Sequence, residues 1–180
     1  MIVSKSEFIS ELQQYTQSHI LAVQKLETAS DEALQARPQL NAWNALECIE
    51  HLNQYGRYYI PEMSTAIANY KGKASDEFKP GLLGNYFAQM MLPSHTKKIK
   101  SMKSYNPIGK QLGREVLVEF LRQQQELLVI LQKCEQVNLT KVKCNISLTK
   151  LLKLRLGDTL RVVIYHNARH MLQAQKALEG

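Results

Sequence analysis

The sequence is poor in the residues and runs that mark several protein classes. Its 180 residues include only three cysteines, five prolines and eight glycines, which excludes a collagen-like fibre and a disulfide-stapled miniprotein. Polar residues interrupt every apolar stretch before it reaches the roughly 18 residues of a membrane span, so we expect no transmembrane helix. What remains is ordinary globular composition, 44% hydrophobic and 22% charged, and the length fits one domain over residues 1–180.

The cysteines and the N-terminal sequence both favour a cytoplasmic location. Cys48, Cys134 and Cys144 are odd in number, lie far apart and form no C-x-x-C pair, as is usual in a reducing compartment. The first residues turn polar within four positions, so the apolar core of a secretory signal is missing. We expect Cys48 to be inert, because it falls on the apolar side of its predicted helix and burial raises the pKa of a thiol.

Positive charge is in excess and is concentrated in two regions. Lysine and arginine number 23 against 16 acidic residues, and much of the excess lies in residues 96–103 and 141–155. These basic patches lack the interleaved aromatic side chains of a nucleic-acid stacking platform. We therefore expect a solvated basic face with weak, salt-sensitive DNA binding at most, and no specific nucleic-acid partner and no membrane partner.

Hydrophobic periodicity predicts an all-α fold. The predicted long helices cover residues 4–28, 44–70, 113–136 and 158–178, and the predicted short ones cover 85–92 and 147–156. Asn44 and Glu47 match a capping box that begins the second long helix, and Pro61 predicts a kink or break near residues 57–61. No segment shows the sustained alternation of a strand. The sequence therefore predicts a four-helix bundle with short additional helices.

Two histidines near the C-terminus are the strongest functional signal. His166 and His170 are four residues apart, which stacks their side chains on one helix face about 6 Å apart along the axis. Val162, Val163 and Ala174 share that face, so both imidazoles are expected to point into the bundle. Burying two imidazoles is unfavourable unless a shared metal ion compensates, although such pairs also arise by chance on helix surfaces.

His51 is the candidate third ligand. It lies one turn after Glu47, at the edge of the apolar face of its predicted helix and beside the polar Tyr58 and Glu62. Three imidazoles from two helices would leave an open coordination position, as in catalytic zinc sites. The alternative is that His51 is a half-buried helix residue without a ligand. His19, in the apolar stripe of the first helix, could line the cleft or be a fourth ligand, but the expected role is that of a core histidine. His95 is expected to be solvated.

Two motifs give the sequence a family resemblance. One is WNALECIEHL at residues 43–52, and the other is HNARHMLQ at residues 166–173. Together they resemble the DinB/YfiT-like superfamily, in which a tryptophan and a histidine eight positions later open the second helix and an H-x-x-R-H-x-x-Q segment lies on the last. The resemblance spans the whole chain. Asn44 stands where family members usually have serine or threonine, but asparagine also caps helices well.

The resemblance implies a four-helix bundle with a divalent metal, commonly nickel or zinc, held by His51, His166 and His170. Family members resemble thiol-dependent S-transferases and isomerases, in which a low-molecular-weight thiol reaches the metal, or metal-dependent hydrolases. We therefore expect a small-molecule substrate and a low-molecular-weight thiol as a further partner. A homodimer is an open alternative to a monomer.

The function expected is that of a metal-dependent hydrolase or thiol S-transferase, which activates a water or a thiol. The candidate catalytic residues are Glu47, Tyr58 and Gln173. Glu47 could instead hold the ring N–H of a ligating histidine, pair with Arg169 or only close the capping box, and Gln173 could serve as an interhelical hydrogen bond. Two alternatives stay open: a non-catalytic, metal-stabilised bundle that is stress-related or binds a partner, and, third, a nucleic-acid-binding module.

Overall fold

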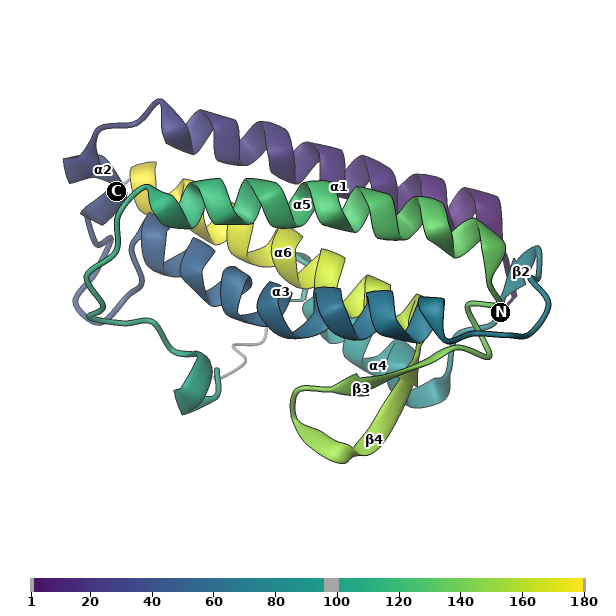
Figure 1. The fold of residues 1–180 in the computed structure, drawn as a ribbon. Helices are drawn as coiled ribbons and strands as arrows, with labels where there is room; N and C mark the ends of the chain where they lie inside the picture. Colours follow the sequence, from purple (N-terminus) through teal and green to yellow (C-terminus); the bar gives the residue numbers. More distant parts are fainter. Residues whose placement is uncertain (1, 96–100, 180) are drawn as a thin grey trace.

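Four long helices pack side by side in the computed structural model, which describes residues 2–95 and 101–179 (Figure 1). They are α1 (Lys5–Glu27), α3 (Ala45–Ala68), α5 (Glu115–Lys133) and α6 (Leu156–Glu179). The two termini lie at opposite ends of the bundle. The predicted all-α bundle is confirmed, because the described chain is mostly helical and its strands are short.

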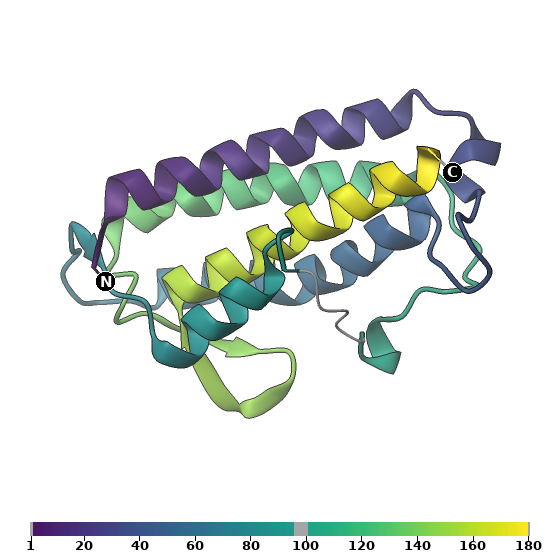
Figure 2. The same cartoon turned by 180° about the vertical axis from the view of Figure 1, so that it is seen from behind.

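Shorter elements cover the ends and one side of the bundle. The helical ones are α2 (Asp31–Gln35), α4 (Leu82–Met91) and the 3-10 turns η1 (Lys103–Tyr105) and η2 (Cys134–Gln136). The strands form two antiparallel pairs, β1 (Val3–Ser4) with β2 (Glu77–Phe78) and β3 (Lys143–Ile146) with β4 (Thr149–Arg155). Seen from behind, α4 lies along α6 and close to the β3–β4 hairpin (Figure 2).

The helix α3 begins as the sequence predicts. The side chain of Asn44 accepts a hydrogen bond from the backbone N–H of Glu47 at 2.8 Å, and the Glu47 carboxylate accepts one from the N–H of Asn44 at 3.1 Å. This reciprocal pair is a capping box. The break expected near residues 57–61 does not occur, since α3 continues through Pro61. Pro61 is exposed, so water can hydrate the carbonyl of Arg57 that the proline leaves without its helical partner.

The main departure from the prediction is the β3–β4 hairpin. The predicted helix over residues 147–156 is wrong, because residues 149–155 form β4 and α6 begins at Leu156. Exposure alternates along β4: Leu151 is 98% exposed, whereas Leu154 is buried opposite the buried Cys144 of β3. The hairpin pairing with β3 and the one-sided burial override the helix propensity of leucine and lysine in the segment.

The interior contains two apolar clusters with a polar layer between them. One cluster includes Leu12 of α1, and the other includes Val23 of the same helix. Between these two positions lies His19, whose Nδ1 is 3.3 Å from Oε1 of Gln124 on α5. The same oxygen accepts a hydrogen bond from Nδ2 of Asn167 on α6 at 3.3 Å. The prediction that His19 is a core histidine is therefore confirmed.

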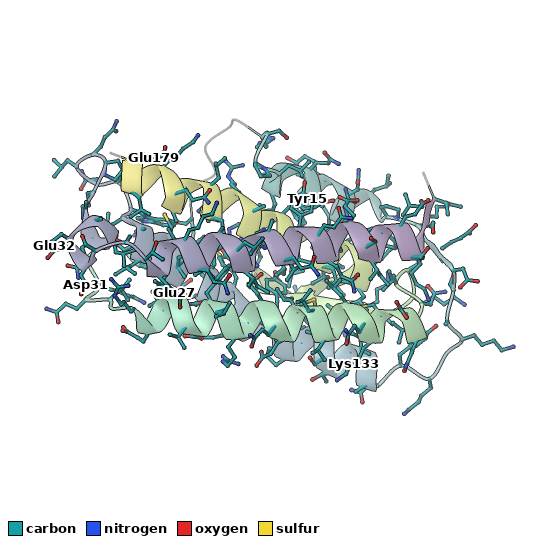
Figure 3. The ribbon with its side chains drawn as sticks, turned by 90° about the horizontal axis from the view of Figure 1, so that it is seen from above. Tyr15, Glu27, Asp31, Glu32, Lys133 and Glu179 are labelled. Atoms are coloured by element: carbon teal, nitrogen blue, oxygen red, sulfur yellow. The ribbon has the colours of Figure 1, made fainter. Side chains whose placement is uncertain are left out.

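An arginine ties the chain together at one end of the bundle. Nε of Arg114 donates to the carboxylate of Asp31 at 2.7 Å, and its terminal nitrogens donate to the carbonyls of Glu27 and Ala29 at 2.7 and 2.6 Å. Glu27 and Asp31 lie together at that end when the bundle is viewed from above (Figure 3). These bonds fix the end of α1 and the start of α2 to the start of α5.

The structure locates part of the basic patches and bears on the expectation that no helix crosses a membrane. Of the first basic patch, residues 96–100 lie outside the described residues, and the second, residues 141–155, spans the β3–β4 hairpin. Among the helices that the structure describes, none combines the length and apolarity that a membrane crossing requires.

Candidate metal centre

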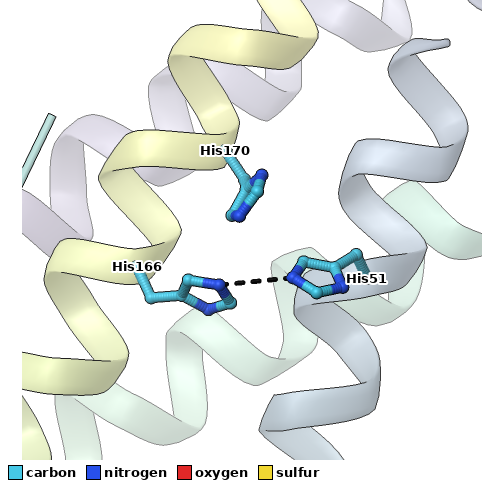
Figure 4. A group of neighbouring side chains, drawn as sticks. All are labelled: His51, His166 and His170. Carbon is cyan, nitrogen blue, oxygen red and sulfur yellow. Dashed lines mark hydrogen bonds between the residues drawn. The ribbon is translucent and has the colours of Figure 1, made fainter. Parts of the chain in front are cut away.

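The antiparallel pairing of α3 and α6 brings three histidines from distant parts of the chain together. His51 projects from α3, and His166 and His170 project from successive turns of α6 toward it (Figure 4). One ring nitrogen from each histidine lies within 4.8 Å of the other two. Nε2 of His51 and Nε2 of His166 lie 3.3 Å apart. The convergence expected from the sequence is therefore present.

The outer nitrogens of two of these rings have fixed acceptors. Nδ1 of His51 donates to the backbone carbonyl of Tyr105 at 2.6 Å, because a carbonyl oxygen can only accept. Nδ1 of His170 lies 2.8 Å from Oε1 of Gln173 and donates to it. When the proton sits on Nδ1 of a neutral imidazole, Nε2 carries the lone pair. The lone pairs of His51 and His170 are thus directed inward, as in metal-binding histidines.

The three imidazoles are kept neutral by their surroundings. Burial lowers the pKa of His51, although the Tyr105 carbonyl acts in the opposite direction. Burial also lowers the pKa of His170 to about 3, with His51 adding to the effect, and it lowers that of His166 well below the ordinary value. Neutral imidazole is the form that binds a metal. With inward lone pairs on two of the rings and no competing positive charge on any of the three, these residues fit one divalent metal ion.

Aromatic rings from α3, from the residue before its cap and from η1 lie against the histidines or against one another beside them. The ring of Trp43 lies 4.7 Å from that of His51 and 5.6 Å from that of His170, centroid to centroid. Tyr55 meets His166 edge-on at 4.8 Å and stacks on Tyr105 at 4.2 Å. These rings cover part of the cluster with apolar surface.

A cavity of about 570 Å³ opens beside the histidines. His51 is only 2% exposed, whereas His166 and His170 are half-buried, and all three line this cavity. Small-molecule sites are usually concave spaces of roughly 300 to 1,000 Å³, so the size is that of a ligand site. A structural metal site is closed by its protein ligands, and an adjoining space of this size is the property of an open one.

The three predicted catalytic residues lie in different surroundings. Gln173 lines the cavity and holds His170, as described above. Tyr58 is not among the described residues that line the cavity, and its ring packs edge-on against Tyr59 at 5.0 Å. Glu47 does not line it either. A catalytic role for each of the three stays a prediction.

The Glu47 carboxylate accepts hydrogen bonds from groups around the start of α3 and has a structural role there. It is fully buried, accepts two hydrogen bonds of 2.6 Å from Arg37 and accepts another from the N–H of Gly109 at 2.7 Å. Burial alone would raise its pKa, but the hydrogen bonds from Arg37, Gly109 and Asn44 keep the pKa of this carboxyl below its ordinary value. Of the three roles considered for Glu47, the capping box is formed; neither a histidine ring nor Arg169 is among its partners in the described part of the chain.

Sequence reasoning assigned no role to two residues that shape the centre. Tyr55 lies four residues after His51, so the same i, i+4 stacking that singled out His166 and His170 places it beside the cluster. The carbonyl of Tyr105 comes from η1, 54 residues further along the chain than His51, and no local pattern points to it. Cys48 behaves as predicted: it is buried, and burial raises the pKa of its thiol to about 12. His95, expected in solvent, is half-buried.

The fold and the cluster together define a four-helix bundle with a three-histidine centre at the interface of its second and last long helices. Residues 14–174 match the DinB superfamily, and the chain therefore belongs to the DinB superfamily, which is metal-binding. No curated protein matches the chain, and no solved structure matches it.

Proposed function

We propose that the chain is a metal-dependent enzyme in which His51, His166 and His170 hold one divalent ion, nickel or zinc, beside the cavity. The observation that carries the proposal is the convergence of three neutral imidazoles within 4.8 Å at the wall of a cavity of about 570 Å³. A divalent ion supplies Lewis acidity, which favours the deprotonated form of a water or a thiol near it. The proposed reaction is hydrolysis or thiol-dependent S-transfer on a small-molecule substrate.

The protein's own residues orient the ligands and keep water out. The Tyr105 carbonyl and the Gln173 side chain fix two of the rings by hydrogen bonds to Nδ1. Such partners of the outer nitrogen set the orientation of a ligating imidazole and raise its basicity. Trp43 and Tyr55 cover the cluster with apolar ring surface. Gln173 also lines the cavity, where its amide nitrogen is available to hold a substrate oxygen.

The cavity favours an enzyme over a metal-stabilised bundle without activity. A purely structural site gains nothing from an adjoining space, whereas a catalytic site needs room for the substrate next to an open coordination position. Half-burial of His166 and His170 leaves the cluster in contact with that space.

Elemental analysis of the chain, purified without a metal-affinity tag, tests the metal site. The expected result is close to one nickel or zinc ion per chain, with a large loss of metal in each of His51→Ala, His166→Ala and His170→Ala. The matched control is His95→Ala, which removes a half-buried imidazole outside the cluster and should leave the metal content unchanged. Undiminished metal in the three cluster variants would show that the ion is bound elsewhere.

Thermal denaturation gives a second, independent measurement. A ligand that binds only the folded state stabilises it by about 2.7 kcal/mol when its free concentration is 100 times the dissociation constant. Chelation should therefore lower the melting temperature of the wild type and of His95→Ala, but not that of His166→Ala. An equal effect of the chelator on all three proteins would contradict binding at the cluster.

A further inference from the structure

The cavity extends from the histidine cluster toward α4 and the β3–β4 hairpin. Its residues on α6 run from Val162 to Gln173, eleven positions that correspond to roughly 16 Å along a helix. On α3 they run from His51 to Tyr59, and α3 and α6 pass each other in opposite directions. The cavity is therefore elongated, with the histidines toward one end and the hairpin at the other.

The two ends of the cavity differ in chemistry. The histidine end carries the ring nitrogens, the Gln173 amide and the Arg169 guanidinium. Away from these groups the wall is mainly apolar, with side chains from three parts of the chain: Phe87, Met90 and Met91 of α4, Ile146, Leu148 and Leu154 of the hairpin region, and Val162 and Val163 of α6.

The Tyr59 hydroxyl and the Arg169 guanidinium, polar groups along the cavity wall, are already hydrogen-bonded within the protein. The hydroxyl of Tyr59 accepts from the backbone N–H of Ser147 at 3.1 Å and lies 3.2 Å from the Ser147 hydroxyl. Nη1 of Arg169 donates to the carbonyls of Met90 and His95 at 3.2 and 2.9 Å. A ligand with a charged or strongly polar body would lose its hydration there without gaining equivalent partners, which is unfavourable. An apolar body gains free energy from the area that it removes from water.

We propose that the cavity binds an elongated, uncharged and mainly apolar small molecule, with its one polar group at the histidine end and its apolar body between α4 and the hairpin. The methionines Met90 and Met91 adapt to different shapes, because their side chains are unbranched and flexible. The orientation of the ligand, with its polar group toward the histidines, rests on the proposed function. Binding of the apolar body in the cavity does not depend on it. A thiol that occupies this cavity is accordingly an apolar thiol and not a charged, peptide-like one.

Fluorescence titration with 6-propionyl-2-(dimethylamino)naphthalene, a neutral apolar probe, tests the proposal on the full chain. The expected result is saturable binding at one site with a blue-shifted emission, both before and after chelation of metal. Benzyl mercaptan should displace the probe, whereas glutathione, which is charged, should not displace it at the same concentration. Absence of saturable binding, or displacement by glutathione but not by benzyl mercaptan, would overturn the proposal.

Two neighbouring positions on α4 provide a matched pair of variants. Met90→Lys places a positive charge at the cavity wall, and Gln89→Lys adds the same charge to the exposed face of the same helix, outside the cavity. Met90→Lys should weaken probe binding at least tenfold, and Gln89→Lys should leave it unchanged. Equal probe affinity in the two variants would place the probe elsewhere on the protein and refute the inference. Circular dichroism checks that each variant is folded. If Met90→Lys does not fold, displacement of the probe from the wild type by benzyl mercaptan or glutathione decides the question.

Metal content measured on the same samples separates this inference from the proposed function. A chain that holds metal at the histidines but does not bind the probe overturns the apolar ligand alone. A chain that binds the probe but holds no metal, even after metal is added, overturns the metal centre alone.

Discussion

Replacing His19 by leucine should remove part of the acid sensitivity of the fold. His19 is 2% exposed, its Nδ1 is bonded to Gln124, and its Nε2 has no hydrogen-bond partner within the described residues. Burial lowers the pKa of His19 to about 4, although the bond to Gln124 acts in the opposite direction. In the unfolded chain the pKa of histidine is about 6.5. The unfolded state therefore binds the proton more readily.

The size of the effect follows from these two pKa values. Neutral His19 makes its full contribution to the free energy of unfolding above about pH 6.5. This contribution is lost as the pH falls toward about 4, because protonation then favours the unfolded state. At pH 5 the loss amounts to about 2 kcal/mol, and between pH 7.5 and pH 6.5 it is small. Leucine cannot bind a proton, and Gln124 keeps its hydrogen bond from Asn167 in the variant.

Urea unfolding of chelated wild type and His19→Leu at pH 7.5 and pH 5.0 measures this difference. Burial lowers the pKa of His51, His166 and His170 in both proteins, so both lose stability in acid. The change in the difference between their free energies of unfolding isolates His19. This difference should shift by about 2 kcal/mol in favour of leucine as the pH is lowered. Parallel losses in the two proteins would refute the assignment of a neutral, buried His19.

Three further substitutions should have separable effects on the free energy of unfolding, measured in urea. Arg37→Ala leaves the buried Glu47 carboxylate with backbone donors only and should destabilise the fold by roughly 2 to 3 kcal/mol, and a neutral outcome would show that Arg37 does not hold it. Gly56→Ala places a Cβ 1.8 Å from Oε1 of the buried Gln123 and should destabilise by about 1 to 3 kcal/mol; a stabilising effect would mean that Gln123 moves aside freely. Leu151→Lys, at a 98% exposed position, should change stability by less than about 0.5 kcal/mol, and a larger loss would reveal a contact for Leu151.

The parts of the structure that could be predicted are those with local causes. The capping box of Asn44 and Glu47 is contained in four consecutive residues, and helical spacing alone places His166 and His170 on one face. Whether His51 meets that pair depends on how α3 and α6 pack. That contact was predicted from the resemblance of the two motifs to the family and not from helical spacing.

The parts that could not be predicted depend on partners outside the segment concerned. The segment that forms β4 shows alternating burial over only a few residues, and its leucines and lysines favour a helix until β3 pairs with it. Glu47 was considered for several roles from its own neighbourhood, but its strongest partner, Arg37, lies in a connection without periodicity.

The position of Arg169 makes the cavity wall and the histidines mechanically dependent on each other. It lies directly before His170 on α6, and its guanidinium holds the Met90 carbonyl in the last turn of α4 and the His95 carbonyl just beyond it. A rotation of α6 that moves the rings therefore also pulls on α4, and a ligand that displaces α4 strains the ring positions. Slower amide exchange in the last turn of α4 should accompany any event that rigidifies the histidines, although the two lie on different helices.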